Sequence, residues 1–252
     1  MDAGMDVPGL PQSATGQAAL MPGVNTARLM GRHVEGFPGP ALREAIRGHN
    51  LFARLRALGC EATFANAYFV TDAADVAQRR IQSVTTVAAL HGLGGVRDTR
   101  QLAANEAVYQ DLTRESLREK GYEGPITTPA EAARHLVAIA RQNHFTLFEY
   151  FQTDRMGHRG RREDVLRGLS LFDQFLGGVL SFLDDPSHLL MITSDHGNIE
   201  VAATPLHTSN PVPFVAMGAG AEFLKARVRL ITDVAPAILA LYEGGEGAGG
   251  RL

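Results

Sequence analysis

The sequence predicts an α/β protein with a mostly parallel sheet and helices on both faces. Its 252 residues are enough for one sizeable domain with a small insertion. Residues 189–193 are apolar or β-branched without interruption, which is typical of a strand buried on both faces inside a parallel sheet. Residues 162–183 carry apolar side chains at helical spacing, as expected for a helix that covers such a sheet.

The composition is that of an ordinary globular protein. A formal net charge of -3 and 20% charged residues give no sign of a nucleic-acid surface. No apolar run approaches the roughly 18 residues that span a bilayer, and the amino terminus does not look like a secretory signal. The single cysteine, Cys60, excludes an internal disulfide, and we interpret it as a core residue. We therefore expect a cytoplasmic protein without nucleic-acid or membrane partners, whose oligomeric state the sequence leaves open.

The first part of the chain contains two hydroxyl groups at the start of a short helical pattern. Residues 1–12 are rich in Gly and Pro and predict no strand, which is unusual for the start of an α/β domain. Ser13 and Thr15 then precede Gly16. A hydroxyl at this position commonly caps a helix, but it can also be a nucleophile whose neighbouring N–H groups attract phosphate. The local sequence leaves both interpretations open.

Residues 21–40 predict a loop, in which Arg32 and His33 could meet an anionic substrate or simply be solvated. Helical spacing follows over residues 40–58, with a break expected at Asn50, and a strand is expected over residues 62–70. Together these segments predict the first part of an α/β core.

Residues 71–127 differ from the rest of the chain in their hydrophobic pattern, because they contain few long apolar runs and a Gly-rich break. They predict a small cap or lid, with helices near residues 99–109 and 113–120. The core is then formed by residues 1–70 and 128–243.

The second part of the core begins at a strong helix signal. Thr128 can cap the helix, Pro129 suits its first position, and Glu131 can complete a capping box. The remaining elements are, in order, a helix to Asn143, a strand over 145–151, a helix over 162–183, strands over 189–193 and 211–218, and a helix over 231–241. The Gly-rich tail 244–252 predicts disorder.

Aspartate and histidine follow two of the predicted strands. Asp154 and His158 come after the strand expected at 145–151. Asp195 and His196 come shortly after the strand expected at 189–193. Open α/β sheets place ligands at the carboxyl ends of their strands. The alternative is a surface turn in which the aspartate caps a helix and the histidine is solvated. Mixed carboxylate and imidazole donors, with His207 a short way further on, suit Zn or Mn. We expect two divalent metal ions here, and with Ser13 a two-metal site for phosphoryl transfer.

Three motifs resemble the metal motifs of the alkaline phosphatase superfamily, nearest the branch of cofactor-independent phosphoglycerate mutase and phosphopentomutase. They are residues 154–158 (DRMGH), 194–198 (SDHGN) and 207–214 (HTSNPVPF), within a resemblance that covers about residues 145 to 240. Residues 13–17 (SATGQ) are similar to the nucleophile loop of these enzymes.

The resemblance implies an alkaline-phosphatase-like fold and a role for each matched residue. One metal would be held by Asp154, His158 and His207, and a second by Asp195 and His196. Ser13 would be the nucleophile, because the family's glycine stands three residues after its Ser or Thr, with Thr15 as the fallback. The implied function is a two-metal phosphoester hydrolase or phosphotransferase that forms a phosphoserine intermediate from a small phosphorylated substrate.

This sequence departs from the family pattern in three ways. The family begins with a strand ending in Asp-Gly, whose aspartate is a further ligand of the second metal, and no such strand is present here. Either the true start lies upstream or the second site is impaired. Gln17 stands where the family usually has His, and the lid is much shorter than the mutase cap. The alternative is therefore a catalytically impaired metal-binding domain. A phosphonate hydrolase also remains open, whereas a sulfatase is disfavoured because no C/S-x-P-x-R motif is present.

Overall fold

The described strands form two separate pairs. The computed structural model describes residues 1–159, 161–180, 183–201 and 204–244, so the predicted disordered tail lies outside the described residues except for Gly244. Strand β1 (Ala62–Phe64) pairs in parallel with β2 (Phe145–Leu147). Strand β3 (Leu189–Thr193) pairs antiparallel with β4 (Phe214–Gly218).

The structure confirms the α/β class and the bounds predicted for β3, but the surroundings of β3 differ from the prediction. Its five residues are half-buried, and its described partner is antiparallel. The chain returns from β3 to β4 through a loop in the described residues between them, whereas parallel pairing requires a crossover that is usually a helix. An apolar run specifies a buried strand but not the direction of its neighbour.

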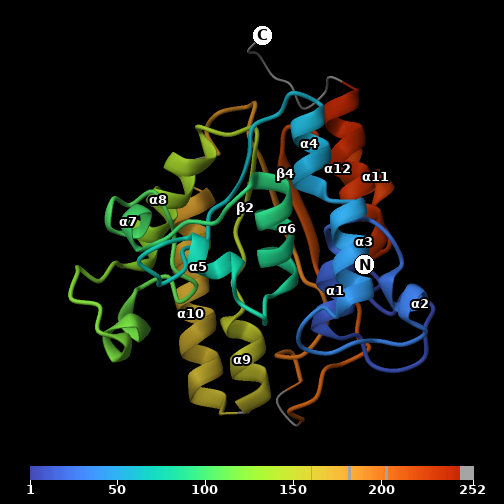
Figure 1. The fold of residues 1–252 in the computed structure, drawn as a ribbon, viewed down its shortest axis with the longest axis horizontal. Helices are drawn as coiled ribbons and strands as arrows, with labels where there is room; N and C mark the ends of the chain where they lie inside the picture. The colour runs from blue at the N-terminus through green and yellow to red at the C-terminus, as the bar shows by residue number, and fades with distance from the viewer. Residues whose placement is uncertain (160, 181–182, 202–203, 245–252) are drawn as a thin grey trace.

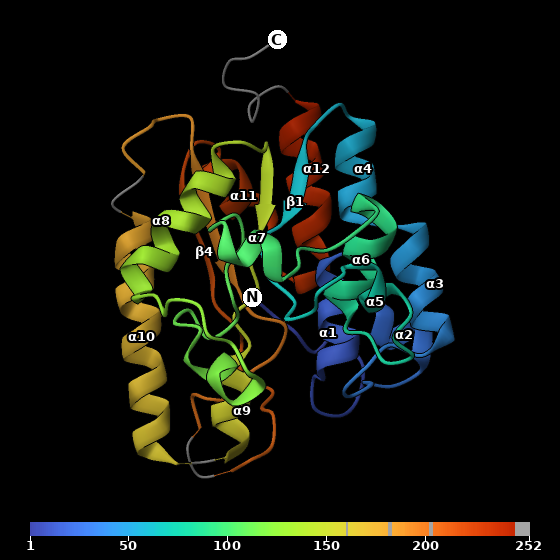
Figure 2. The ribbon, with the colours of Figure 1, turned by 60° about the vertical axis from the view of Figure 1, so that its left-hand side comes forward.

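Helices cover both faces of the strands, as predicted (Figures 1 and 2). One core lies among helices α1 (Ser13–Leu20), α3 (Pro40–Gly48), α4 (Leu51–Ala57), α6 (Val84–Leu93), α11 (Ala221–Arg227) and α12 (Val234–Glu243). A second core, on the other face, lies between the strands and helices α8 (Pro129–Ala140) and α10 (Arg162–Leu180). In Figure 2, α8 and α10 stand on the left of the strands, and α3, α4 and α6 stand on the right.

The first part of the chain follows the prediction with two differences. Helices α1 (Ser13–Leu20), α3 (Pro40–Gly48) and α4 (Leu51–Ala57) are as expected, and the predicted break at Asn50 is the N-cap of α4. The expected loop at 21–40 contains a short helix, α2 (Thr26–Met30), which Asn25 caps and Gly31 ends in the left-handed region. The expected strand at 62–70 stops at residue 64, because the next residues form single bridges to residues 97 and 108.

The segment predicted as a lid divides into two parts. Helix α6 (Val84–Leu93), which follows the short α5 (Ala74–Ala77), packs into the main core. The assignment of residues 71–127 to a cap or lid stays a prediction. Only the part around α7 (Thr99–Ala103) and the 3-10 helix η1 (Glu115–Lys120) has a small apolar cluster of its own.

Both helices predicted in that segment are shorter than expected. Asn105 and Arg114 adopt positive φ angles of 62° and 66°, which an α-helix does not accommodate. The helix expected over 99–109 therefore ends at residue 103, and the one expected over 113–120 begins at residue 115 as a 3-10 helix.

The second part of the core confirms the strongest local signal. Helix α8 (Pro129–Ala140) begins with the expected capping box, in which Thr128 and Glu131 bond each other's backbone N–H. The later helices are α9 (Gln152–Arg159), α10 (Arg162–Leu180), α11 (Ala221–Arg227), η2 (Ile231–Asp233) and α12 (Val234–Glu243). None of the described helices combines the length and the apolar character that crossing a bilayer requires.

Candidate metal centre

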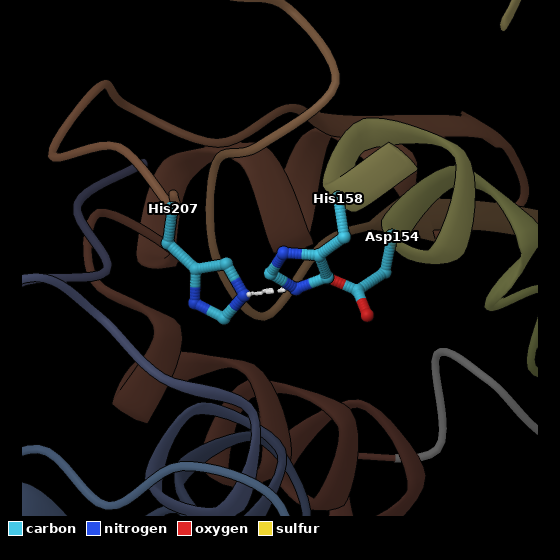
Figure 3. A group of neighbouring side chains, drawn as sticks. All are labelled: Asp154, His158 and His207. Atoms are coloured by element: carbon cyan, nitrogen blue, oxygen red, sulfur yellow. Dashed lines mark hydrogen bonds and ion pairs between the residues drawn. The ribbon is translucent and has the colours of Figure 1, made fainter. Parts of the chain in front are cut away.

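Three of the predicted metal ligands meet at one point. Asp154 and His158 lie one turn apart on α9, so their side chains share a face of that helix, and His207 reaches them from the loop before β4 (Figure 3). Asp154 Oδ1 is 3.2 Å from His158 Nε2 and 3.4 Å from His207 Nε2, and the two Nε2 atoms are 3.1 Å apart. Among the described residues, this is the one group of three or more such donors close enough to share an ion.

Backbone carbonyls orient both imidazoles of this group. His158 Nδ1 donates to the carbonyl oxygen of Pro205 (2.6 Å), and His207 Nδ1 donates to that of Pro11 (2.8 Å). Because a carbonyl oxygen only accepts, each ring carries its proton on Nδ1 and turns the lone pair of Nε2 inward. Asp154 Oδ1 is buried there without a hydrogen-bond partner in the described structure. Two lone pairs and an unpaired carboxylate oxygen suit a divalent cation.

A second group adjoins the first at the carboxyl end of β3. His196 Nε2 lies 3.5 Å from Asp195 Oδ2 and 3.9 Å from Asp154 Oδ1. The His196 ring stacks on that of His207, with centroids 3.7 Å apart. Ser13 Oγ is 3.0 Å from His196 Nε2, although the two residues are 183 positions apart in the chain. The fold therefore brings all five predicted ligands and Ser13 together.

The pKa shifts differ among the groups of this centre: those of Asp195 and His196 move toward the uncharged form, whereas the pKa of Asp154 is lowered by the nearby histidines against the effect of burial. Burial raises the pKa of Asp195 to about 6, and the charge of Asp154 acts in the same direction. Burial lowers the pKa of His196 to about 4, and positive charge on His207 adds to this. A bound cation would favour the ionised carboxylate and the neutral imidazole that serve as ligands.

The start of α1 distinguishes the two predicted hydroxyl groups. Ser13 is the first residue of the helix and makes no capping bond, so its interpretation as a cap is wrong. Thr15 is fully buried, and its hydroxyl donates to the Gln12 carbonyl and accepts from the Val34 N–H. Of the two hydroxyls, that of Ser13 is the one beside the metal-ligand group.

The N–H groups expected to attract a phosphate at this helix start are already occupied. Those of Ala14 and Thr15 both donate to the Val34 carbonyl, at 3.1 and 3.3 Å. Gly16 allows α1 to approach the second group, because a Cβ at this position would lie 2.5 Å from the carbonyl oxygen of Asp195. The hydrogen bonds to Val34 and the close approach at Gly16 thus set the position of Ser13.

Glu149, a buried carboxylate, was not singled out in the sequence. It follows β2, and its carboxylate accepts hydrogen bonds from Gln17 Nε2 (3.1 Å) and Thr85 Oγ1 (2.7 Å). Burial raises its pKa to about 7, although the bond from Thr85 opposes this. Its backbone is held by both side-chain amide atoms of Asn66. The available signal was one acidic residue inside the apolar run at 145–151.

The two residues proposed for substrate binding lie apart from this group. Arg32 is exposed, and His33 is buried with Nε2 3.1 Å from the Val7 carbonyl oxygen. A cavity of about 810 Å³ contains Ser13, Asp154 and Asp195 on its wall, and neither Arg32 nor His33 lines it. Their role in binding substrate stays a prediction.

Comparisons with known proteins agree with the motifs. The family model described as the metalloenzyme superfamily matches residues 117–243. Similar curated proteins include 2,3-bisphosphoglycerate-independent phosphoglycerate mutases of Legionella pneumophila (strain Corby), 35% identical, and Agrobacterium fabrum (strain C58), 29% identical. Each match covers 46% of this chain and 24% or 25% of the relative, so the matched part spans about a quarter of these curated relatives. No solved structure matches this chain.

Proposed function

Because this chain belongs to the metalloenzyme superfamily, we propose that it is a metal-dependent phosphotransferase or phosphoester hydrolase with Ser13 as its nucleophile. The observation that carries the proposal is the position of Ser13 Oγ, 3.0 Å from His196 Nε2 and beside the Asp154 group. Relatives named as phosphoglycerate mutases support a small phosphorylated substrate.

The donor set divides into two ligand groups in this proposal. Asp154, His158 and His207 hold one divalent ion, and Asp195 and His196 contribute to a second one near Ser13, with Mn or Zn as the expected ions. When bound, the ions supply Lewis acidity that favours an ionised hydroxyl and stabilises charge on a phosphoryl group.

The protein residues then position the reacting hydroxyl. Ser13 Oγ forms a bond to phosphorus while the bond from phosphorus to the leaving oxygen breaks. The Ser13 proton passes to solvent, and the leaving oxygen takes up a proton from solvent. Attack by water or by an acceptor hydroxyl releases the phosphoryl group from Ser13. Thr15, whose hydroxyl is held by the backbone of Gln12 and Val34, fixes this turn of α1.

One observation favours the second candidate, a metal-binding domain with impaired catalysis. The first group offers three protein ligands in the described structure, whereas the second offers Asp195 and His196 besides the Ser13 hydroxyl. An ion held by fewer protein ligands leaves more readily. This candidate predicts full occupancy of the first site and no turnover of phosphoesters.

The test is turnover of p-nitrophenyl phosphate by the purified chain in Mn or Zn. We expect Ser13→Ala to abolish turnover and the labelling of the protein by a phosphoryl group, detected by mass spectrometry. Ser170→Ala, which removes an exposed serine from α10, serves as the matched control and should leave both unchanged. Undiminished turnover by a folded Ser13→Ala variant would contradict Ser13 as the nucleophile, and metal binding without any turnover would favour the impaired domain.

A further inference from the structure

The ligands of the metal centre come from three separate segments of the chain. Helix α9 carries Asp154 and His158, the residues after β3 include His196, and the loop before β4 carries His207. The Nε2 atoms of His158 and His207 are 3.1 Å apart with both lone pairs turned inward, and Asp154 Oδ1 is buried without a hydrogen-bond partner in the described structure. The first group thus contains no donor hydrogen that could hold it together. Residues outside the ligand set must therefore hold the segments at this spacing.

A backbone bridge joins two of these segments. The Thr208 N–H donates to the Gly197 carbonyl oxygen (2.9 Å), and the two residues form an isolated antiparallel bridge. They directly follow His207 and His196, whose rings stack with centroids 3.7 Å apart. A Cβ at Gly197 would lie 2.6 Å from Glu200 Oε1, so only glycine allows this close approach. The bridge therefore sets the backbone next to both histidines.

The carboxylate of Glu200 fastens the bridge from both sides. Its Oε2 accepts from the Asn198 N–H (2.7 Å), which adjoins Gly197. Its Oε1 accepts from the Thr208 hydroxyl and from Asn210 Nδ2, the latter at 3.1 Å. Burial acts to raise the pKa of Glu200, but these hydrogen bonds outweigh it and lower the pKa, so the carboxylate is ionised at neutral pH. Hydrogen bonds to a charged acceptor are stronger than those between neutral groups. Glu200 therefore ties the segment after β3 to the segment before β4.

The buried side chain of Asn198 extends this connection to α9. Its amide oxygen occupies the position that a Cβ at Gly157 would take, directly before His158. Its Nδ2 lies 3.5 Å from the carbonyl oxygen of Leu206, directly before His207. Asn198 thus contacts the neighbours of two ligands in the first group, and its backbone N–H makes the carboxylate bond described above.

We propose that Glu200 and Asn198 are positioning residues of the metal centre, which hold the three ligand-bearing segments at a fixed spacing for ion binding. Neither contributes a ligand atom itself. The proposal rests on the first ligand group described above, but not on the reaction at Ser13. Without these two residues, a bound ion would first have to order the segments, which costs affinity. Changes to residues that orient metal ligands typically weaken metal binding by about tenfold or more.

The first test compares the affinity for Zn in the complete chain by titration calorimetry. Glu200→Ala should weaken binding by about tenfold because the bridge loses its carboxylate, and Asn198→Ala should weaken it because α9 loses its contact with the bridge. Glu222→Ala removes an exposed glutamate from α11 and is the matched control, which should bind Zn as the unmodified chain does. Unchanged affinity of either folded variant would overturn the proposal for that residue.

The unmodified chain separates this proposal from the proposed reaction. If it binds no Zn at all, the ligand assignment is wrong and the proposal falls with it. If it binds Zn but turns over no phosphoester, the result counts against the reaction at Ser13 and not against the positioning of the ligands.

Two conservative variants separate positioning from the effect of negative charge. Glu200→Gln removes the charge, but its amide oxygen can still accept from the Asn198 N–H and its amide nitrogen can donate to the Thr208 hydroxyl. It should therefore bind Zn more like the unmodified chain than like Glu200→Ala. Thr208→Val keeps the charge and removes one hydrogen bond, so it should weaken binding. If Glu200→Gln is as weak as Glu200→Ala while Thr208→Val binds normally, Glu200 acts through its charge and the proposal is wrong.

The double variant Glu200→Ala/Thr208→Val tests whether the two residues act through the bond between them. A shared action predicts that the double variant binds Zn about as weakly as the weaker of the single variants, because the bond can be lost only once. Independent residues would give effects that multiply. Multiplied effects would contradict the clamp formed by these two side chains.

Hydrogen exchange tests the bridge in the metal-free chain. The Thr208 amide, which donates to the Gly197 carbonyl, should be protected in the unmodified chain and lose protection in Glu200→Ala. The Val87 amide of α6, which donates to the Ser83 carbonyl, should keep its protection and so show that the variant is folded. Full protection of the Thr208 amide in a folded Glu200→Ala variant would overturn the role of Glu200.

Discussion

The buried carboxyl of Glu149 predicts an unusual dependence of stability on pH. Its pKa is raised to about 7 from the ordinary value of 4.5 for a glutamate, with burial as the main cause. A carboxyl whose pKa is higher in the folded state binds more protons there, so stability is fully present below about pH 4.5 and is lost as pH rises through about 7. The loss amounts to at most about 3 kcal/mol, because each pKa unit corresponds to about 1.4 kcal/mol and because the residue as a whole is half-buried, although its carboxyl is held by Gln17 and Thr85.

Glu149→Gln should remove most of this loss in the metal-free chain. The glutamine oxygen can still accept from Gln17, and its amide can donate to the Thr85 hydroxyl, so the local bonds survive without a charge. Urea unfolding at intervals from pH 4.5 to 8 should give a flatter stability curve than that of the unmodified chain. Glu44→Gln, an exposed change on α3, should leave the curve as it was. Parallel curves for Glu149→Gln and the unmodified chain would refute the reasoning.

Two further predictions concern the metal centre and the helix that carries the nucleophile. His158→Ala should weaken binding of Zn by at least about tenfold in titration calorimetry, because it removes one of three ligands, whereas the exposed change His91→Ala should not. Unchanged affinity would exclude His158 as a ligand. Gly16→Ala should lower the free energy of unfolding by about 1 to 3 kcal/mol, since its Cβ would meet the Asp195 carbonyl. Gly48→Ala, with open space around the new methyl group, is the control, and equal stability of the two variants would contradict the close approach.

The parts of the structure that were predictable from sequence are those specified locally. The capping box of Thr128 and Glu131 depends on residues three apart, and the structure forms it as expected. The group of Asp154, His158 and His207 was predicted because the carboxyl ends of strands gather ligands and because the motifs resemble a known family. The helix α9 that carries the first two was not expected, since Asp154 and Gly157 have low helix propensity.

Features that depend on contacts between distant parts of the chain could not be predicted from the sequence pattern. The apolar run at 189–193 specifies a strand, but its antiparallel partner depends on how the following loop returns. The position of α6 in the main core depends on its contacts with α3 and α4, which no pattern within residues 84–93 reveals. Glu149 was overlooked because one acidic residue within an apolar run gives no sign of the partners it acquires, Gln17 and Thr85.

The hydrogen bond from His207 to the Pro11 carbonyl joins segments 196 positions apart. Pro11 precedes Ser13 by two residues, and its ring restricts the backbone at that point. The amino-terminal segment therefore holds a metal ligand in place from outside the ligand group itself. During folding, the ligand group reaches its final geometry only after this segment has docked. The rate at which a refolding chain gains tight metal binding should therefore equal the rate at which this amino-terminal segment docks.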